Sequence, residues 1–373
     1  MGALKRIIAV IALSAAAACA GAQSTLSPTP LQPHSSLVAQ NNSVAGLAYG
    51  TGASLLFEAQ DTGSNAYLYL AKLPKGPTYT LTTAAYAPVG VAFNHAGTTA
   101  YAWYGNYYGS FSAELDAIDA SNGKLVGTAP ANGCGGSLAL TPDETIAVAD
   151  DSCENAVQLF SLPSLKITAT VGLNGLNNPT GVAIDASGKK AYVAGNGGIA
   201  IVDIRRARQT GIITVPGGSC WLGAITGIAL VQRSSRAYAA TCDQANEEPL
   251  VAVVDTRSQK LIKTIDVGNA AKEWPLAVAA SALHHYVYVS VENSDGIHGE
   301  LSALDTRTNT VTKIEKLSWS PNAVAMSPND SAVFATTWRG TVWYSVGPGG
   351  FKGKQKGPIC CQTALAAFGN FVH

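Results

Sequence analysis

The segment Pro179–Gly195, PTGVAIDASGKKAYVAG, contains the pattern that decides the fold. An apolar stretch ends at Ile184, a polar turn follows at 186–189, and a second apolar stretch reaches Gly195. Two further short apolar runs, Gly198–Asp203 and Thr210–Val215, come directly afterwards. Runs of this length, bounded by Gly, Asn, Asp and Ser, predict four consecutive β-strands joined by tight turns.

The pair Val182-Ala183 in the first of these strands belongs to a repeat of about 45 residues. The other copies are Leu47-Ala48, Val91-Ala92, Leu138-Ala139, Ile228-Ala229, Val278-Ala279 and Val324-Ala325. A period of this length filled with short strands is typical of a β-propeller. We therefore predict an all-β fold over residues 43–373, a seven-bladed β-propeller of four-stranded antiparallel blades.

Closure of the ring is open at this point. Leu365-Ala366 forms an eighth copy of the motif, closer to the seventh copy than the period requires. Either Ser35–Gln40 supplies a missing outer strand, or Thr363–Phe368 joins as an extra one. We favour seven blades with closure by one of the termini.

The composition restricts the class of partner. Hydrophobic residues make up 47% of the chain and charged residues 13%, and 24 Lys and Arg balance 24 Asp and Glu. No net field attracts the protein to nucleic acid or to an anionic membrane. We therefore expect no nucleic-acid partner, and we expect a monomer.

The N-terminus has the features of an export signal. Lys5 and Arg6 precede an apolar stretch at 7–18, and Ala20-Gly21-Ala22 offers a cleavage site. This stretch is shorter than the roughly 20 residues that a membrane-spanning helix needs. We predict a signal peptide at 1–22, a polar linker at 23–42 and a periplasmic or extracellular protein without a transmembrane segment. Cys19 lies in a stretch that resembles a bacterial lipobox, so lipidation is the alternative.

The cysteines agree with export. Without Cys19 six remain, an even number suited to an oxidising compartment. The repeat register places two pairs in corresponding positions of the third and fifth repeats, which predicts the disulfides Cys134–Cys153 and Cys220–Cys242. Cys360 and Cys361 are left as a vicinal disulfide or as two reduced thiols.

Several segments resemble the YVTN-type propeller repeat. Asp185–Gly195 resembles its second-strand signature, and Val254–Ser258 and Leu304–Asn309 are similar to its third-strand turn. The resemblance implies a propeller but no single role, because such propellers serve many functions. Some relatives are lactonases or quinoproteins, but their Gly-Pro-Arg-His segment and regular Trp motif are absent here. The third-strand residues Asp119, Asp203, Asp255 and Asp305 recur with the repeat and are expected to cap turns.

The register also assigns loops to two rims of the ring. The loop rim contains the loops before each first strand and those between second and third strands, and the turn rim lies opposite. Aromatic residues concentrate on the loop rim, where Trp and Tyr give large contact areas at low entropic cost. We predict ligand binding there by Trp103, Tyr104, Tyr108, Trp221, Trp274, Trp319, Trp338 and Arg339. The alternative role for any one ring is packing between blades.

Acidic side chains on the same rim could bind calcium, which prefers oxygen ligands. They are Asp150, Asp151, Glu154, Asp243, Glu247, Glu248, Glu292 and Asp295. No calcium-loop motif is present, so solvated charges are the alternative. His298 is the one histidine expected on this rim, which makes His298, Glu292 and Asp295 the catalytic candidates.

Two hypotheses follow. The first is a non-catalytic binding or scaffold module that engages a glycan, a peptide or a cell-envelope protein through the aromatic rim. The alternative is a hydrolase or lyase, similar to the lactonases, with a metal-assisted site on the same rim.

Overall fold

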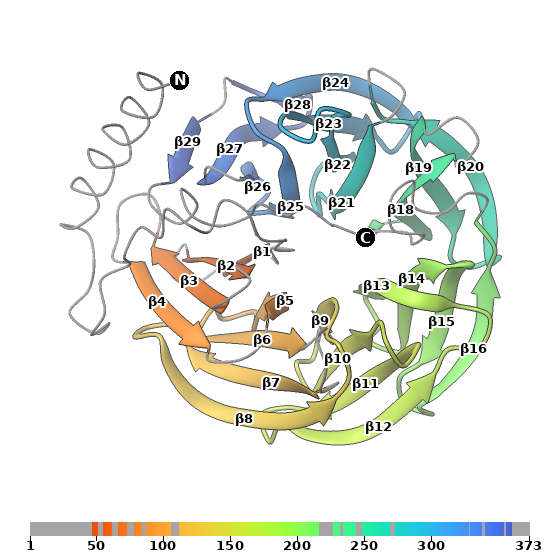
Figure 1. The fold of residues 1–373 in the computed structure, drawn as a ribbon. Coiled ribbons are helices and arrows are strands. Elements are labelled where there is room, and N and C mark those ends of the chain that lie inside the picture. Colours follow the sequence, from red (N-terminus) through yellow and green to blue (C-terminus); the bar gives the residue numbers. More distant parts are fainter. Residues whose placement is uncertain are drawn as a thin grey trace, which may run out of the picture.

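The computed structural model of the chain is a ring of antiparallel sheets around a central axis (Figure 1). It describes residues 47–50, 55–61, 66–72, 78–83, 87–105, 112–215, 227–231, 234–243, 248–268, 273–327, 329–337, 340–353 and 356–359. Within these ranges every regular element is a β-strand, and none contains a helix long and apolar enough to span a membrane. The predicted signal peptide and linker lie outside them.

Seven sheets form the ring, and each follows the chain from the inner strand to the outer one. Blade 1 contains β1 (Leu47–Gly50), β2 (Leu55–Asp61), β3 (Ala66–Lys72) and β4 (Thr78–Thr83). Blade 2 contains β5 (Ala87–Phe93), β6 (Thr99–Gly105), β7 (Ser112–Asp119) and β8 (Lys124–Asn132). Blade 3 contains β9 (Leu138–Leu140), β10 (Ile146–Asp151), β11 (Ala156–Ser161) and β12 (Lys166–Gly172).

The remaining blades repeat this order. Blade 4 contains β13 (Asn177–Ile184), β14 (Lys190–Asn196), β15 (Gly198–Asp203) and β16 (Arg208–Ile213). Blade 5 contains β17 (Gly227–Val231), β18 (Arg236–Asp243), β19 (Glu248–Asp255) and β20 (Lys260–Asp266). Blade 6 contains β21 (Trp274–Ala280), β22 (Tyr286–Glu292), β23 (Gly299–Asp305) and β24 (Thr310–Leu317). Blade 7 contains β25 (Pro321–Met326), β26 (Ala332–Thr337), β27 (Gly340–Gly347), β28 (Gly350–Phe351) and β29 (Lys356–Ile359). The predicted all-β propeller of antiparallel blades is confirmed; six of its seven sheets have the predicted four strands, and that of blade 7 has five.

Blade 7 completes its outer edge with two short strands. Both β28 and β29 pair with β27, and β1 of the first blade lies against β25. The fourth strand of this blade therefore comes from Lys356–Ile359, ahead of the eighth motif copy in the sequence. The two segments proposed for closure, 35–40 and 363–368, lie outside the described residues.

Burial follows the position of a strand within its blade. In blade 6, all of β23 and all of β22 except Glu292 are buried, whereas the outer strand β24 alternates between exposed and half-buried residues. The middle strands are covered on both faces because each blade packs against two neighbours. Between blades 6 and 7, Tyr288 and Tyr344 both contact Phe351, with ring centroids 5.2 and 5.1 Å apart. These interfaces between blades form the hydrophobic core.

The turns between third and fourth strands have the predicted aspartate caps. The Asp255 carboxylate accepts the backbone N–H groups of Arg257 and Ser258 at 2.8 and 2.7 Å. Asp203 and Asp305 accept N–H groups at the same place in their blades. These hydrogen bonds lower the pKa of the Asp203 and Asp255 carboxyls, and at Asp305 the Arg307 side chain contributes most to the lowered pKa. The turn-capping prediction is therefore confirmed.

Packing between blades should dominate stability. Leu301 is 0% exposed and lies in the cluster between blades 6 and 7, whereas Leu125 on an outer strand is 54% exposed. We expect Leu301→Ala to reduce the free energy of unfolding by about 3 kcal/mol and Leu125→Ala by less than about 0.5 kcal/mol. Denaturant titration of both variants measures this, and equal losses would contradict the assignment of the core.

Candidate functional site

The loop rim of blades 6 and 7 brings together several of the predicted site residues. Trp274 begins β21, and its backbone pairs with that of Glu292 at the end of β22. The Ser320 hydroxyl, in the loop that leads into β25, donates a 2.7 Å hydrogen bond to the Glu292 carboxylate. Burial raises the pKa of Glu292, although the Ser320 hydrogen bond partly opposes this effect. Glu292 is thus held at the junction between two blades.

The turn 293–298 carries the other two catalytic candidates. Asp295 accepts the backbone N–H groups of Ile297 and His298 at 2.8 and 2.9 Å, and its second oxygen lies 2.6 Å from His298 Nδ1. These contacts lower the pKa of Asp295 to about 2, the largest contribution coming from the His298 side chain. The side chains of His298 and Asp295 are 52% and 45% exposed. The pair is therefore ordered by its own turn and accessible to a ligand.

The neighbouring loop completes this surface. The Ser320 N–H donates a 2.6 Å hydrogen bond to the Ile297 carbonyl oxygen, which fixes the loop 318–320 against the turn 293–298. Trp319 lies in that loop, and both Trp319 and Trp274 are half-buried. We call Trp274, Glu292, Asp295, His298 and Trp319 the blade 6–7 site. Its geometry offers two indole rings, a solvent-facing carboxylate and an imidazole.

Two of the predicted ligand-binding residues lie instead inside the ring. Trp103 is 0% exposed, its Nε1 donates a 2.9 Å hydrogen bond to the Asp150 carbonyl oxygen, and its ring meets Phe160 edge-on at 5.5 Å. Tyr104 is likewise 0% exposed, and burial raises its pKa. In this structure the packing alternative therefore describes both rings. They follow one another at the end of β6, where neighbouring blades cover both faces of the strand.

The remaining predicted ligand-binding residues lie outside the described part of the chain. They are Tyr108, Trp221, Trp338 and Arg339. Cys220, Cys360 and Cys361 also lie outside it, whereas Cys242 is described and is disulfide-bonded. Its pairing with Cys220 stays a prediction.

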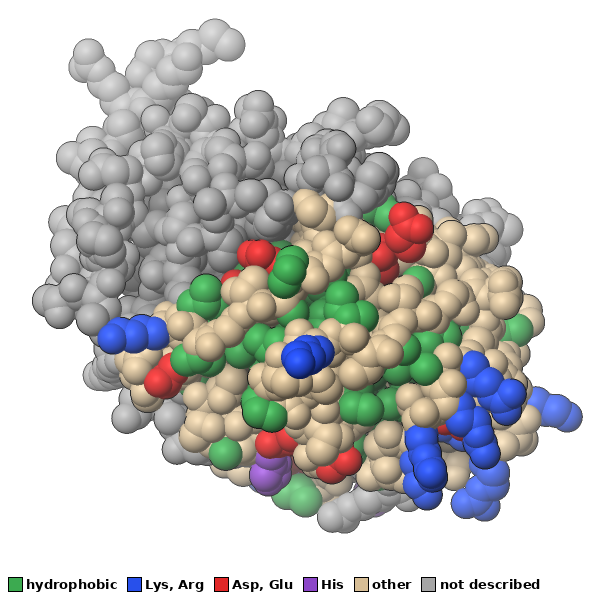
Figure 2. All heavy atoms as spheres, turned by 90° about the horizontal axis from the view of Figure 1, so that it is seen from below, with side chains coloured by type: hydrophobic (Ala, Val, Ile, Leu, Met, Phe, Trp, Pro, Cys, Tyr) green, Lys and Arg blue, Asp and Glu red, His purple; other side chains and the backbone are tan. Residues whose placement is uncertain are grey.

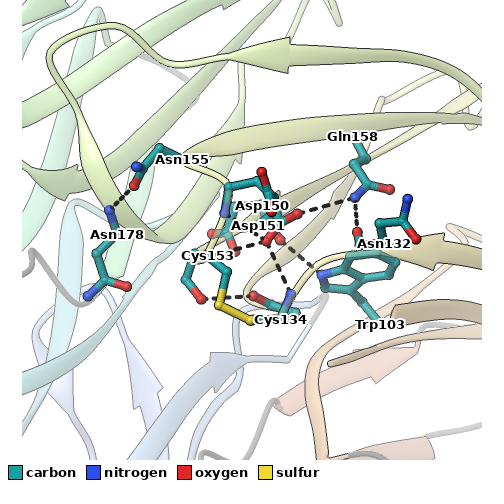
Figure 3. Close-up of a disulfide and its surroundings, with 12 residues drawn as sticks. Trp103, Asn132, Cys134, Asp150, Asp151, Cys153, Asn155, Gln158 and Asn178 are labelled. Carbon is teal, nitrogen blue, oxygen red and sulfur yellow. Dashed lines mark hydrogen bonds between the residues drawn. A yellow bond between two sulfur atoms is a disulfide. The ribbon is translucent and has the colours of Figure 1, made fainter. Parts of the chain in front are cut away.

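The first predicted disulfide is present on the loop rim of blade 3. Cys134 precedes β9 and Cys153 follows β10, and their sulfur atoms are bonded (Figure 3). Asp151 lies beneath this bridge and accepts the backbone N–H groups of Cys134, Cys153 and Glu154 at 3.1, 3.2 and 3.3 Å. The bridge and the carboxylate together fix the two loops to one another.

Asp150, the preceding residue, is fully buried. One carboxylate oxygen accepts the Ser137 N–H at 2.7 Å, while the other has no hydrogen-bond partner among the described residues. Burial raises its pKa well above the ordinary value. A Cβ placed on Gly136 would lie 1.4 Å from the bonded oxygen, so a glycine is required there. The side chain is enclosed by its own blade and is not offered to a ligand.

The described acidic side chains of the loops predicted for calcium form no metal site. Among the described residues, no group of three or more His, Cys, Asp or Glu side chains is arranged to hold a metal ion. Asp150 and Asp151 are occupied by backbone N–H groups, and Glu292 by Ser320. The side chains of Asp243 and Glu247 lie outside the described part. We therefore derive no metal-assisted step.

Comparison with solved structures identifies the fold. A chain in the crystal structure of the mitotic checkpoint complex superposes with a TM-score of 0.64 and 14% identity, over 79% of this chain and 86% of that one. Kuenenia stuttgartiensis hydrazine synthase gives a TM-score of 0.56 and 15% identity, over 69% of this chain and 76% of that one. Both likenesses are at low identity and show a shared β-propeller fold and nothing more. No protein-family model and no curated protein matches the sequence.

The blade 3 bridge should contribute strongly to stability. We expect Cys134→Ser with Cys153→Ser to lower the free energy of unfolding by about 3 kcal/mol, because the unfolded chain gains loop freedom. Thermal unfolding of the double variant measures the loss. Peptide mapping under non-reducing conditions should recover a linked 134–153 fragment, and its absence would contradict the pairing.

Buried Asp116 should make stability depend on pH. Burial raises the pKa of Asp116 to about 6, while the Thr128 hydroxyl donates a 2.6 Å hydrogen bond that opposes the shift. The folded state then binds the proton more tightly than the unfolded chain, so this contribution is full below about pH 4 and is lost as pH rises through about 6. Asp116→Asn should therefore raise the melting temperature at about pH 8 and leave it unchanged near pH 4.

Asp119 supplies the control of opposite sign. Hydrogen bonds from Ser121 lower its pKa, so its contribution is present above about pH 4 and is lost below it. Asp119→Asn should lower the melting temperature at neutral pH. If both variants respond to pH in the same direction, the assignment of Asp116 is wrong.

Proposed function

We propose that this protein is an exported, non-catalytic binding propeller whose blade 6–7 site holds a basic peptide segment of a cell-envelope partner protein. The backbone contacts that join Trp274 to Glu292, and the loop of Trp319 to the turn of the exposed Asp295, carry the proposal. The signal-like segment at 1–22 and the disulfide of blade 3 support export. The resemblance of Asp185–Gly195 to the YVTN repeat supports placement among YVTN-type propellers.

The side chains of this site suit a cationic group. The face of an indole attracts Lys and Arg side chains, with about 0.5–1 kcal/mol gained at exposed positions. Asp295 stays ionised at every physiological pH, because its pKa lies at about 2. It can therefore pair with a bound cation. A Lys or Arg on an extended peptide would lie between the indoles and this carboxylate.

The charges around the site agree with this choice. Exposed carboxylates on the described loop rim are Glu154, Glu248, Asp266 and Asp295. The basic residue described closest to this rim is Lys316 near the end of β24. A positively charged segment is therefore attracted over a broader area than the site itself, which accelerates association. A neutral glycan would stack on the same indoles but would gain nothing from these charges.

The second candidate is the hydrolase or lyase. It is favoured by the 2.6 Å contact between Asp295 and His298 Nδ1, since a carboxylate that orients an imidazole is the usual support of a general base. Glu292, with its raised pKa, could supply a proton nearby. This candidate requires turnover of a lactone or uronide, which the binding module does not.

Loss of the two indoles tests the leading proposal. We expect Trp274→Ala with Trp319→Ala to weaken binding of a Lys- and Arg-rich peptide by about tenfold or more in calorimetry. The control is Trp343→Ala, on the third strand of blade 7, where the ring stacks on Phe334 at 6.2 Å. Circular dichroism checks that each variant stays folded. Equal affinity in both variants, or tighter binding of neutral glycans than of the peptide, would overturn the proposal.

His298 separates the two candidates. His298→Ala should leave peptide affinity within about twofold, because the bound cation is placed between the indoles and the Asp295 carboxylate and not on the imidazole. Under the enzyme candidate the same change abolishes hydrolysis across a panel of lactones and uronides. Turnover by the natural protein that disappears in this variant would replace the binding proposal by the catalytic one.

A further inference from the structure

The balanced net charge of the chain conceals a basic surface on the turn rim. This rim consists of the turns between first and second strands and between third and fourth strands. In blades 4, 5 and 6, which are neighbours along the ring (Figure 1), these turns carry Lys189, Lys190, Arg205, Arg206, Arg208, Arg236, Arg257, Lys260 and Arg307. We call this set the basic arc. A side view of the molecule likewise shows Lys and Arg side chains gathered at one edge rather than spread evenly (Figure 2).

The carboxylates in the turns that carry the basic arc accept hydrogen bonds from groups of those same turns. Asp185 accepts the Lys189 N–H at 2.9 Å, and Asp255 accepts two backbone N–H groups. Arg206 and Arg307 pair with the aspartates of their turns, whereas Arg205 forms no ion pair with a described residue. The basic side chains outnumber the carboxylates, so the arc keeps a positive potential.

A groove lies within this arc, between blades 5 and 6. Its volume is about 380 Å³. Its lining includes Arg236, Arg307, His285, Ser234 and Ser235, together with Asp255. Two guanidinium groups and two hydroxyls are the donors that recognise carboxylate, sulfate and phosphate oxygens.

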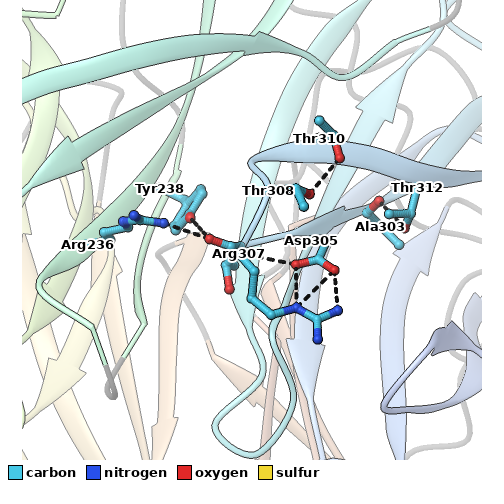
Figure 4. A network of polar contacts seen from close by, with 9 residues as sticks. Arg236, Tyr238, Ala303, Asp305, Arg307, Thr308, Thr310 and Thr312 are labelled. Carbon is cyan, nitrogen blue, oxygen red and sulfur yellow. Dashed lines mark hydrogen bonds and ion pairs between the residues drawn. The ribbon is translucent and has the colours of Figure 1, made fainter.

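The Arg236 guanidinium is held at the wall of the groove. Its Nη1 donates a 2.7 Å hydrogen bond to the Thr306 carbonyl oxygen, and the Tyr238 hydroxyl lies 3.5 Å from the same oxygen (Figure 4). The buried Tyr238 hydroxyl also donates to Asn309 Oδ1 at 2.7 Å. Arg307 follows Thr306 in the turn of blade 6 and pairs with Asp305 (Figure 4). A guanidinium has five N–H donors, so the Thr306 contact leaves others for a ligand. The groove therefore holds Arg236 in a fixed position with donors left over for an anion.

We propose that the basic arc binds a linear acidic polysaccharide, with one of its carboxylate or sulfate groups in the groove beside Arg236 and Arg307. A chain of repeating anionic groups can follow the curved row of turns from blade 4 to blade 6. Anionic membranes fit less well, because a flat surface would also press on blades 2 and 3. The turns of those blades carry Asp119, Asp143 and Glu144 as well as Lys124 and Lys166.

Nucleic acid also fits less well than a polysaccharide. Single strands bind where aromatic rings stack with bases along a basic groove. The described aromatic residues near the basic arc, Tyr192, Tyr238 and Tyr286, are 3%, 0% and 5% exposed and offer no stacking surface. Direct competition between the three kinds of polyanion decides between them.

The test measures binding of the full chain to heparin, polygalacturonate, single-stranded poly-dT and vesicles of equal parts phosphatidylglycerol and phosphatidylcholine. We expect heparin or polygalacturonate to bind most tightly, the first indicating sulfate and the second carboxylate recognition. The variant Lys189→Gln, Lys190→Gln, Arg205→Gln should weaken this binding by about tenfold. Adding Arg307→Gln, at the groove, to this triple variant should weaken binding of the same polysaccharide further.

The control is Lys124→Gln, Lys166→Gln, Lys316→Gln, which removes the same charge outside the basic arc. It should change affinity by less than about twofold at moderate salt, where distant charges are screened. Equal weakening by the arc variant and the control would mean that the binding depends only on the overall charge, and it would overturn the proposal. Tighter binding of vesicles or poly-dT, or no binding of either polysaccharide, would overturn it as well. A failure here leaves the blade 6–7 site untouched, because the substitutions in the basic arc and the groove lie on the opposite rim.

Discussion

Packing of blade against blade is the constraint on which the rest of this structure depends. A four-stranded sheet has two apolar faces along its middle strands, and only another sheet on each side can cover both. Here Val289 and Leu301 on β22 and β23 are 0% exposed because blades 5 and 7 enclose blade 6. The ring must then close, since an open end would leave such a face in water. In the structure β1 and β25 make this closing contact.

The same constraint sorts the chemistry of the chain onto two rims. Strands that are buried on both faces can carry few functional groups, so these groups gather in the connections between strands. The long connections of the loop rim carry indoles, carboxylates and the disulfide. The short connections of the turn rim carry aspartate caps and, in blades 4 to 6, the basic arc. A chain without net charge therefore presents two faces of opposite character.

The sequence predicted the features that repeat and missed those that depend on three-dimensional neighbours. The 45-residue period was sufficient to predict the blades, the aspartate caps and the Cys134–Cys153 bridge, because each occupies a fixed place in the repeat. The register also placed Trp103 near the loop rim, but it could not tell that its ring turns inward onto Phe160.

Charge was the second limit of the sequence. The total of 24 basic and 24 acidic residues indicated no electrostatic partner. Their positions in the repeat hold the missing information, since Lys189, Arg205 and Arg257 all fall in turns of one rim. A count of charge by rim, rather than over the whole chain, would have found the basic arc. Asp116 shows a related limit. It lies in a middle strand, and its raised pKa comes from its burial, which the sequence alone does not show.

Amide hydrogen exchange of the full chain, measured once with a Lys- and Arg-rich peptide and once with heparin, tests the division between the rims most directly. The account predicts that the peptide protects 293–298 and 318–320, whereas heparin protects 186–189, 204–207 and 256–259. Protection of the same segments by both ligands, or of the outer strands alone, would contradict it.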